Sequence, residues 1–311
     1  MPVSVDTPSP WPQRFAVLTA LATLPLLFIG GLVTSTGSGL AVPDWPTTFG
    51  ENMFLYPWSK MVGGIFYEHS HRLFGSLVGF LTILLTVSLW RNESRQWLRW
   101  LGIVALVAVV LQGILGGLRV VLLQQTLAII HACFAQAFFA LTVSLALFTS
   151  AEWRTSIEPH ITAGARRVQR LGLVTTGLLY LQLIFGALLR HYGEAAVLHI
   201  VGAVLVAIHI LLFASRILRH HADFPSMARP ALALRWFLVV QLLLGVGAYL
   251  GKFTQSGAFL APYFVPLATV HVVIGALMLV TSLILTLRAF RFFTVDSVPR
   301  SSQMVSQQAS V

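Results

Sequence analysis

The chain has 311 residues, of which 57% are hydrophobic and only 10% are charged, and its formal net charge is +10. Because soluble domains carry about 25% charged residues, this composition excludes an ordinary water-soluble fold. A positive charge is also typical of nucleic-acid-binding proteins, but the basic residues here are spread over short segments between long apolar runs. This distribution favours charges that set membrane topology over a nucleic-acid-binding patch.

Eight apolar segments are each long enough to cross a bilayer, which takes about 20 residues of helix. In chain order they are residues 15–35, 69–90, 98–118, 126–149, 169–189, 195–215, 232–251 and 264–288. The first lacks the small-residue cleavage site of a signal peptide, so it is predicted to remain as a helix after a cytoplasmic N-terminus at 1–14. The sequence therefore predicts an all-α membrane protein with eight transmembrane helices.

Lysine and arginine orient these helices. With a cytoplasmic N-terminus, 15 of the 20 basic residues fall on the inner side of the membrane and five on the outer side. Both termini are therefore predicted to lie in the cytoplasm. The protein is predicted to span the plasma (inner) membrane of a bacterium. The longest outer segment, 36–67, is rich in Gly, Pro and Trp and is expected to be an ordered cap. The polar tail, 291–311, is expected to be cytoplasmic and disordered.

The two halves of the chain repeat in register. QGILG in the third segment matches QLLLG in the seventh, and LAIIH in the fourth matches LATVH in the eighth. With four segments in each half, the repeat is parallel, about an axis along the membrane normal. The sequence predicts two pseudo-symmetric four-helix bundles, 15–150 and 169–290, joined by a cytoplasmic linker at 151–168.

Four of the ten histidines share one depth, one or two turns inside the outer end of each even-numbered segment. They are His71, His131, His199 and His271. A lone histidine in a membrane helix most often hydrogen-bonds a neighbouring helix, but four at one depth favour a functional site, because ionisable groups there are costly. Zinc prefers tetrahedral clusters, whereas one histidine from each of two helices suits axial ligation of haem iron. Two haem sites are predicted, side by side in the outer half of the membrane.

A carboxylate distinguishes the two halves. Glu68 lies three residues before His71, whereas Ala196 stands at the matching place before His199. Residues three apart share a helical face, so Glu68 is predicted beside the first haem only. The alternative, which the spacing leaves open, is that Glu68 only favours its helix N-terminus through the dipole. His69 faces elsewhere and is expected at the membrane interface.

Four basic residues are predicted on the outer side near the haems, where they pair with haem propionates or snorkel beside the helices. They are Arg72, Arg119, Arg190 and Lys252. His191, beside Arg190, is predicted either to contact a haem edge or to lie at the membrane interface.

At these residues the chain resembles the haem A synthases. The resemblance covers about residues 20–290 and rests on GGLVTSTGSGLAVPDWP, EHSHR, QGILGGLRV, LHIVGA and LATVHVVIGAL. Members of this family oxidise a ring methyl of haem O to the formyl group of haem A, and they hold haem b as a second group. The resemblance implies that His71 and His131 ligate the iron of the substrate, haem O. It implies that His199 and His271 ligate the iron of haem b. Glu68 then corresponds to the catalytic carboxylate of the family.

The chain departs from the family in its first outer loop, where many members carry a cysteine pair. Val42 and Thr48 stand at those positions, and Cys133 is the one cysteine, so the chain resembles the cysteine-free branch and its electron route is open. The resemblance implies haem O synthase as a partner. The sequence does not identify the electron acceptor, and it is compatible with a homo-oligomer. The alternative function is a dihaem electron carrier or haem-binding assembly factor without catalysis, which has no need of Glu68.

Overall fold

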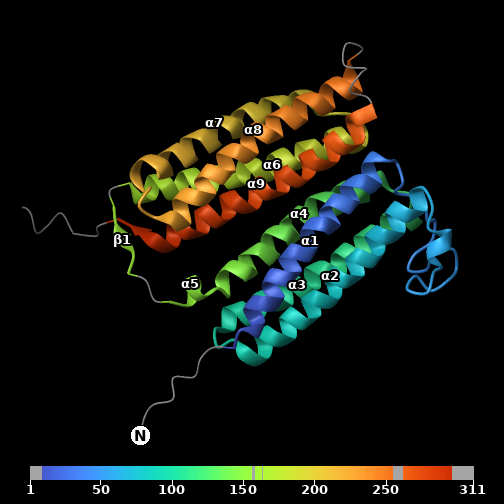
Figure 1. The fold of residues 1–311 in the computed structure, drawn as a ribbon, viewed down its shortest axis with the longest axis horizontal. Coiled ribbons are helices and arrows are strands. Elements are labelled where there is room, and N and C mark those ends of the chain that lie inside the picture. Colours follow the sequence, from blue (N-terminus) through green and yellow to red (C-terminus); the bar gives the residue numbers. More distant parts are fainter. Residues whose placement is uncertain (1–8, 156–157, 163, 255–261, 296–311) are drawn as a thin grey trace, which may run out of the picture.

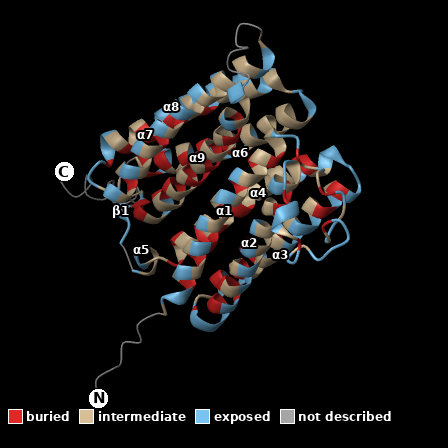
Figure 2. Ribbon diagram, turned by 45° about the vertical axis from the view of Figure 1, so that its right-hand side comes forward, coloured by how far each residue is buried: buried red, intermediate tan, exposed pale blue. Residues whose placement is uncertain are grey.

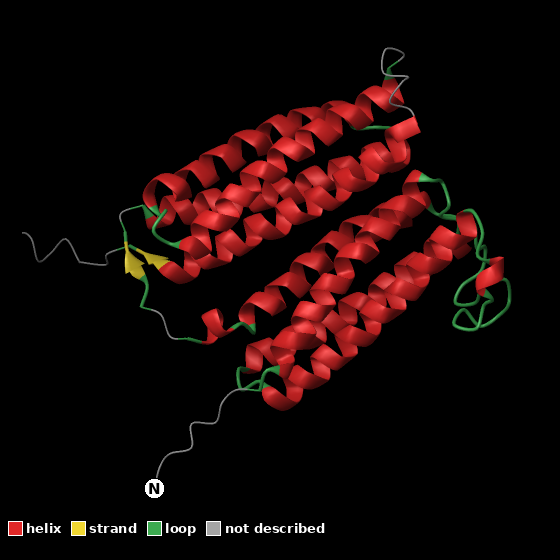
Figure 3. Ribbon diagram, in the orientation of Figure 1, coloured by secondary structure: helices red, strands yellow, loops and turns green. Residues whose placement is uncertain are grey.

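The structure is a computed structural model that describes residues 9–155, 158–162, 164–254 and 262–295. Its long helices are α1 (Trp11–Ser35), α2 (Gly64–Asn92), α3 (Gln96–Val121), α4 (Gln125–Phe148), α6 (Ala165–Tyr192), α7 (Ala196–His220), α8 (Pro225–Phe253) and α9 (Phe264–Phe292). These eight helices are all long and apolar enough to cross a membrane. The predicted all-α membrane fold with eight transmembrane helices is confirmed (Figure 3).

Most helices extend beyond the apolar runs that predict them. Helix α2 begins at Gly64 instead of residue 69, and α8 begins at Pro225 instead of residue 232. The hydrocarbon core of a bilayer is about 30 Å thick, but the headgroup regions bring the total to about 40–45 Å. A helix can therefore continue through the headgroup region with polar residues, which lie outside the apolar run used to predict it. For this reason α2 begins early enough to include Glu68.

The helices are arranged as two four-helix bundles, α1–α4 and α6–α9 (Figure 1). Helices α1 and α4 of the first bundle pack against α9 of the second, and α4 also contacts α6. Leu27, Phe139, Ala276 and Val280 form a small apolar cluster across this junction. Buried residues follow the faces between helices, whereas the outward faces carry many exposed apolar side chains (Figure 2). This is expected of a bundle in lipid, because acyl chains solvate apolar side chains as well as a core does.

Short elements close the ends of the bundles. They are η1 (Trp58–Lys60), α5 (Ala151–Arg154), β1 (His160–Ile161) and β2 (Phe293–Thr294). Strands β1 and β2 pair in parallel, with His160 opposite Phe293. The predicted disordered tail therefore began too early, because α9 and β2 occupy its first residues and Phe293 is buried. Residues 296–311 lie outside the described part of the chain.

His221, directly after α7, is buried at this end, and its ring stacks on Phe293 with centroids 4.2 Å apart. Burial, and then the nearby His220 and Arg216, hold the pKa of His221 below its usual 6.5. The folded protein thus keeps this ring neutral at a pH where the unfolded chain already binds a proton. The free energy of unfolding should therefore fall as the pH decreases below about 6.5.

The measurement is thermal unfolding in detergent between neutral pH and about pH 5. His221→Phe keeps the stacking and should remove part of the loss on acidification, whereas His220→Gln, at an exposed position, should keep most of it. An unchanged pH dependence in His221→Phe would contradict this assignment.

Candidate functional site

The four predicted histidines form two pairs, one in each bundle. The ring centroids of His71 on α2 and His131 on α4 are 6.3 Å apart. Those of His199 on α7 and His271 on α9 are 6.2 Å apart. A metal ion lies about 2 Å from each ligating nitrogen, and the nitrogen lies about 1 Å from its ring centroid, so two imidazoles on opposite sides of one ion have centroids about 6 Å apart. Both pairs have the spacing of two axial ligands.

Each histidine ring packs against a glycine of the preceding long helix. A Cβ at the glycine would lie 3.0–3.1 Å from Cε1 of the ring, closer than nearly all real Cβ contacts. The four contacts are Gly30 with His71, Gly116 with His131, Gly186 with His199, and Gly245 with His271. An alanine there would need the ring to move by a few tenths of an ångström, so these glycines allow the close packing of the four imidazoles.

Glutamines on α3 and α6 hold the backbone beside two of the histidines. Nε2 of Gln112 donates to the carbonyl oxygen of His131 over 3.1 Å. Nε2 of Gln182 donates to the carbonyl oxygen of His199 over 2.7 Å and lies 3.1 Å from Nδ1 of that ring. Each glutamine stands four residues before the glycine that its histidine touches. The sequence signal was this Gln-x-x-x-Gly pattern, which sequence analysis used only as a mark of the repeat, and Gln182 was missed.

The third glutamine, Gln241 on α8, determines the tautomer of its histidine. Nδ1 of His271 lies 3.2 Å from the carbonyl oxygen of Gln241. Because a carbonyl oxygen only accepts, this contact favours the proton on Nδ1 and the lone pair on Nε2 of the ring. Nε2 of the Gln241 side chain lies 3.3 Å from Nε2 of the ring and can donate to that lone pair. A metal ion bound at this Nε2 would replace the contact with the Gln241 amide.

The donor set fits a haem better than a bare metal ion. Within the described ranges there is no group of three or more His, Cys, Asp or Glu side chains that would hold a metal ion. In the first bundle, Nδ1 of His71 and of His131 is buried without a hydrogen-bond partner among the described residues. Two imidazoles on different helices supply two ligands to a metal ion. A haem supplies the other four from its planar ring, which can lie between the helices.

Glu68 lies in the second turn of α2, which begins at Gly64. The helix dipole acts mainly on charges within the first turn. A stabilising effect of Glu68 on the helix dipole is therefore small at this position. The side chain is only 5% exposed. Its Oε1 accepts a hydrogen bond from Nη2 of Arg72 over 2.9 Å, and its Oε2 accepts one from the backbone N–H of Val42 over 2.9 Å. Both oxygens therefore hold the outer segment.

Arg72 is the centre of this attachment. Its Nη1 donates to the carbonyl oxygens of Asp44 and Thr47, over 2.7 and 3.0 Å, and its Nη2 donates to the carbonyl oxygen of Val42 over 2.9 Å. Burial raises the pKa of the Asp44 carboxyl, but hydrogen bonds from Gly50, Thr47 and the Phe49 backbone outweigh it and bring this pKa to about 2. The segment 36–63 is thus an ordered cap on the first bundle; the predicted segment, 36–67, ended too late because α2 begins at Gly64.

The two positions where many haem A synthases carry cysteines are both fully buried under this cap. Val42 bonds to Glu68 and Arg72, and Oγ1 of Thr48 lies 3.1 Å from Nδ1 of His69. The ring of His69 also lies 5.2 Å from that of Tyr56. His69 is 1% exposed beneath the cap, and its place at the membrane interface stays a prediction.

The other outer residues also bind the protein itself. Arg119 donates to the carbonyl oxygen of Gly39 over 2.7 Å, and the ammonium group of Lys252 lies 5.2 Å from the ring centroid of Phe253. Arg119 and His191 help to line a pocket of about 320 Å³ at the outer ends of α1, α4 and α6. Arg119 is thus bonded to the protein backbone, whereas Lys252 is exposed, and propionate pairing and snorkelling both stay predictions.

Arg190 links the two bundles beside the histidine pairs. From α6 it donates to the carbonyl oxygen of Gly31 on α1 over 2.9 Å, and also to Oγ of Ser35. Ser35 in turn lies 2.9 Å, oxygen to oxygen, from Thr269 on α9. Gly31 follows the glycine against His71, and Thr269 lies two residues before His271. The two bundles are therefore joined at these helix ends, next to both pairs.

Comparison with known proteins adds a family to this geometry. A heme A synthase of Shouchella clausii is 36% identical over 136 residues, which are 43% of this chain and 44% of that protein. A heme A synthase of Geobacillus kaustophilus is 30% identical over 183 residues, 57% of this chain and 55% of the relative. The chain thus spans about half the length of the curated relatives it matches. The profile of the COX15-CtaA family, described as cytochrome oxidase assembly protein, matches residues 13–198. The chain therefore belongs to this family, and the predicted resemblance to the haem A synthases is confirmed.

Proposed function

We propose that the protein is a haem A synthase, an oxidoreductase that converts a ring methyl of haem O to the formyl group of haem A by successive hydroxylations. The observation that carries this proposal is the pair of histidines with iron-ligand spacing in each bundle. Relatives named heme A synthase, which match about half of their length, support it. The product would serve the assembly of cytochrome oxidase, the process for which the family is named.

The two bundles are proposed to hold different groups. His71 and His131 would bind the substrate haem O, and His199 and His271 would bind haem b. The asymmetry of the cap supports this division, because Glu68 and the loop it holds belong to the first bundle alone. Haem b, when bound, supplies a redox centre for the removal of electrons.

The residues of the chain supply position and charge. His71 and His131 would hold the haem iron of the substrate, and Gly30 and Gly116 pack against these imidazoles. Glu68 is the proposed catalytic carboxylate: one of its oxygens accepts protons as the methyl group is oxidised. The cap over Glu68, tied down by Arg72, keeps water away from this carboxylate.

The proposed topology has both termini in the cytoplasm of a bacterium and the histidines near the outer face. This orientation rests on the distribution of lysine and arginine. Haem O carries a long isoprenoid tail that dissolves in the bilayer. We therefore propose that it reaches the first bundle through the bilayer, from haem O synthase.

The test uses a host that makes haem O but lacks its own haem A synthase. Haem extracted from its membranes and separated by chromatography should contain haem A when this chain is expressed, and His209→Ala, which lies outside both pairs, should give the same result. Haem O and haem B alone, with a haem-loaded protein, would identify a dihaem carrier or assembly factor and refute the enzyme.

A further inference from the structure

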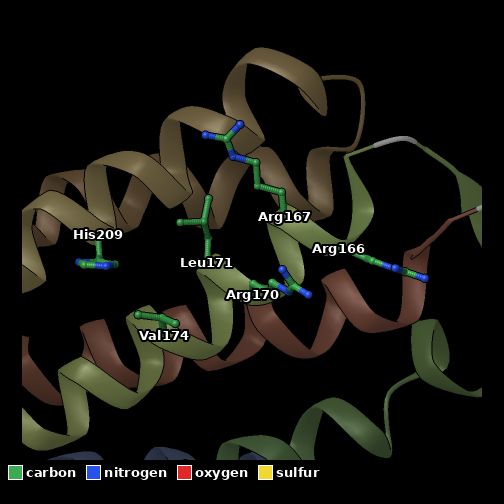
Figure 4. Close-up of a pocket in the computed structure, with 6 residues that line it drawn as sticks. All are labelled: Arg166, Arg167, Arg170, Leu171, Val174 and His209. Carbon is green, nitrogen blue, oxygen red and sulfur yellow. The ribbon is translucent and has the colours of Figure 1, made fainter.

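A groove of about 440 Å³ lies between α6 and α7, far from the histidine pairs (Figure 4). Arg166, Arg167 and Arg170 line one end, and the ring of His209 lies at the other. On α6, Arg167, Leu171 and Val174 follow one another at helical spacings of four and three, so they form one stripe facing α7. From Arg166 to Val174 the groove descends about 12 Å into the membrane, at about 1.5 Å per residue.

The charged end has no counterion among the residues that the structure describes. The three arginines are exposed, and none has a hydrogen-bond or ion-pair partner among the described residues. Helix α6 begins at Ala165 without an acidic residue in its first turn, so the positive end of its dipole adds to their field. By contrast, Arg95 and Arg288, at the same end of the molecule, are paired with Glu93 and Glu152.

The deep end is apolar and closed at the back. Val174 and the neighbouring Leu173 are largely exposed, as are Leu205 and Ile208 on α7, so the groove is continuous with the lipid-facing surface. Behind it the two helices pack closely, with Oγ1 of Thr175 3.5 Å from the carbonyl oxygen of His209. His209 bonds through Nδ1 to the carbonyl oxygen of Leu205 on its own helix, over 2.8 Å.

We propose that this groove binds one anionic phospholipid of the membrane. The three arginines at one end of the groove extend in different directions (Figure 4), and their exposed side chains would turn toward the phosphate group. An acyl chain then runs along Leu171 and Val174 toward His209. The groove matches this occupant because it combines unpaired positive charge at headgroup depth with an apolar channel below it. It lies at the end of the molecule that is predicted to face the cytoplasm, where anionic headgroups attract basic pockets.

Native mass spectrometry of the purified full chain tests this proposal, with phosphatidylglycerol and phosphatidylcholine of identical acyl chains as probes. Phosphatidylglycerol should stay bound at higher collision energy and with higher affinity. Because each basic residue near an anionic headgroup contributes about fivefold in binding, the variant Arg166→Gln/Arg167→Gln/Arg170→Gln should lose at least about tenfold in affinity. The matched control is Arg91→Gln/Arg219→Gln/Arg229→Gln, three exposed arginines outside the groove, which should lose little.

A second variant separates the groove from general surface charge. Val174→Trp keeps every arginine and fills the apolar channel from a position that is 47% exposed, so it should fold and yet weaken phosphatidylglycerol. Equal retention of the two lipids, equal losses in both arginine triples, or unchanged binding in Val174→Trp would each overturn the proposal. Displacement of the lipid by excess inorganic phosphate would overturn it as well, by showing a site for the free anion.

Discussion

Replacing His71 by alanine should reduce the haem bound in the first bundle at least about tenfold while leaving the second bundle loaded. Outer partners of a metal ligand already contribute about 10–100-fold to affinity, and His71 is proposed as a ligand itself. His131→Ala should give the same loss, because the two rings face each other at 6.3 Å. His199→Ala and His271→Ala should deplete the other site. The measurement is haem per protein chain, with the absorption spectrum of the purified protein.

The matched control for these variants is His209→Ala. His209 also lies inside a membrane-spanning helix, but its Nδ1 bonds to its own helix and it faces the groove between α6 and α7. Haem content should therefore stay unchanged. A loss in His209→Ala as large as in His71→Ala would mean that histidine removal unsettles the bundles in general, and full haem content in all four paired variants would refute the haem sites.

Replacing Glu68 by alanine should abolish haem A formation and destabilise the cap by about 3 kcal/mol or more. Removing one partner of a buried ion pair costs about 3–5 kcal/mol, because the other charge stays buried and unpaired. Here Arg72 loses its carboxylate, and the backbone N–H of Val42 loses its acceptor. Haem A yield measures the chemistry, and limited proteolysis between residues 36 and 63 measures the cap.

Arg72→Gln distinguishes the two contributions of Glu68. This variant loosens the same cap, since the carbonyl oxygens of Val42, Asp44 and Thr47 lose their donor, but it keeps the carboxylate. If Glu68 takes part in the oxidation, Arg72→Gln should keep a measurable haem A yield and Glu68→Ala should keep none at equal proteolysis. Identical losses of haem A in both variants would restrict Glu68 to holding the cap.

The fold followed closely from the sequence, because a bilayer permits few alternatives. Backbone groups in lipid must be bonded within their own segment, so an apolar run of the right length becomes a helix. All eight predicted helices are present, and the errors are confined to their ends. There the headgroup region accepts both polar and apolar residues, and hydropathy cannot locate a terminus such as Gly64.

The sequence predicted which histidines pair in each bundle, but it did not predict the contacts that surround them. The common depth of four histidines singled them out, but the second set of residues around them was missed, since a glutamine or glycine in an apolar helix is usually a packing residue. The Gln-x-x-x-Gly pattern acquires its meaning only when Gln182 and Gly186 are seen against His199. Arg72, Arg119 and Arg190 bond to backbone carbonyl oxygens that no sequence pattern displays, and their roles toward propionates or the membrane surface stay predictions.

The sequence by itself determined the number of helices, the family and the histidines, because these depend on hydropathy, spacing and residue type along one chain. Tertiary structure alone decided that Glu68 and Arg72 both bond to the backbone of Val42, and that Val42 and Thr48 are buried under the cap. It also decided that Arg190 reaches α1 of the other bundle. Each of these contacts joins a side chain to backbone or side-chain groups far away in sequence or on another segment, and such pairings are selected by the packing of the whole molecule.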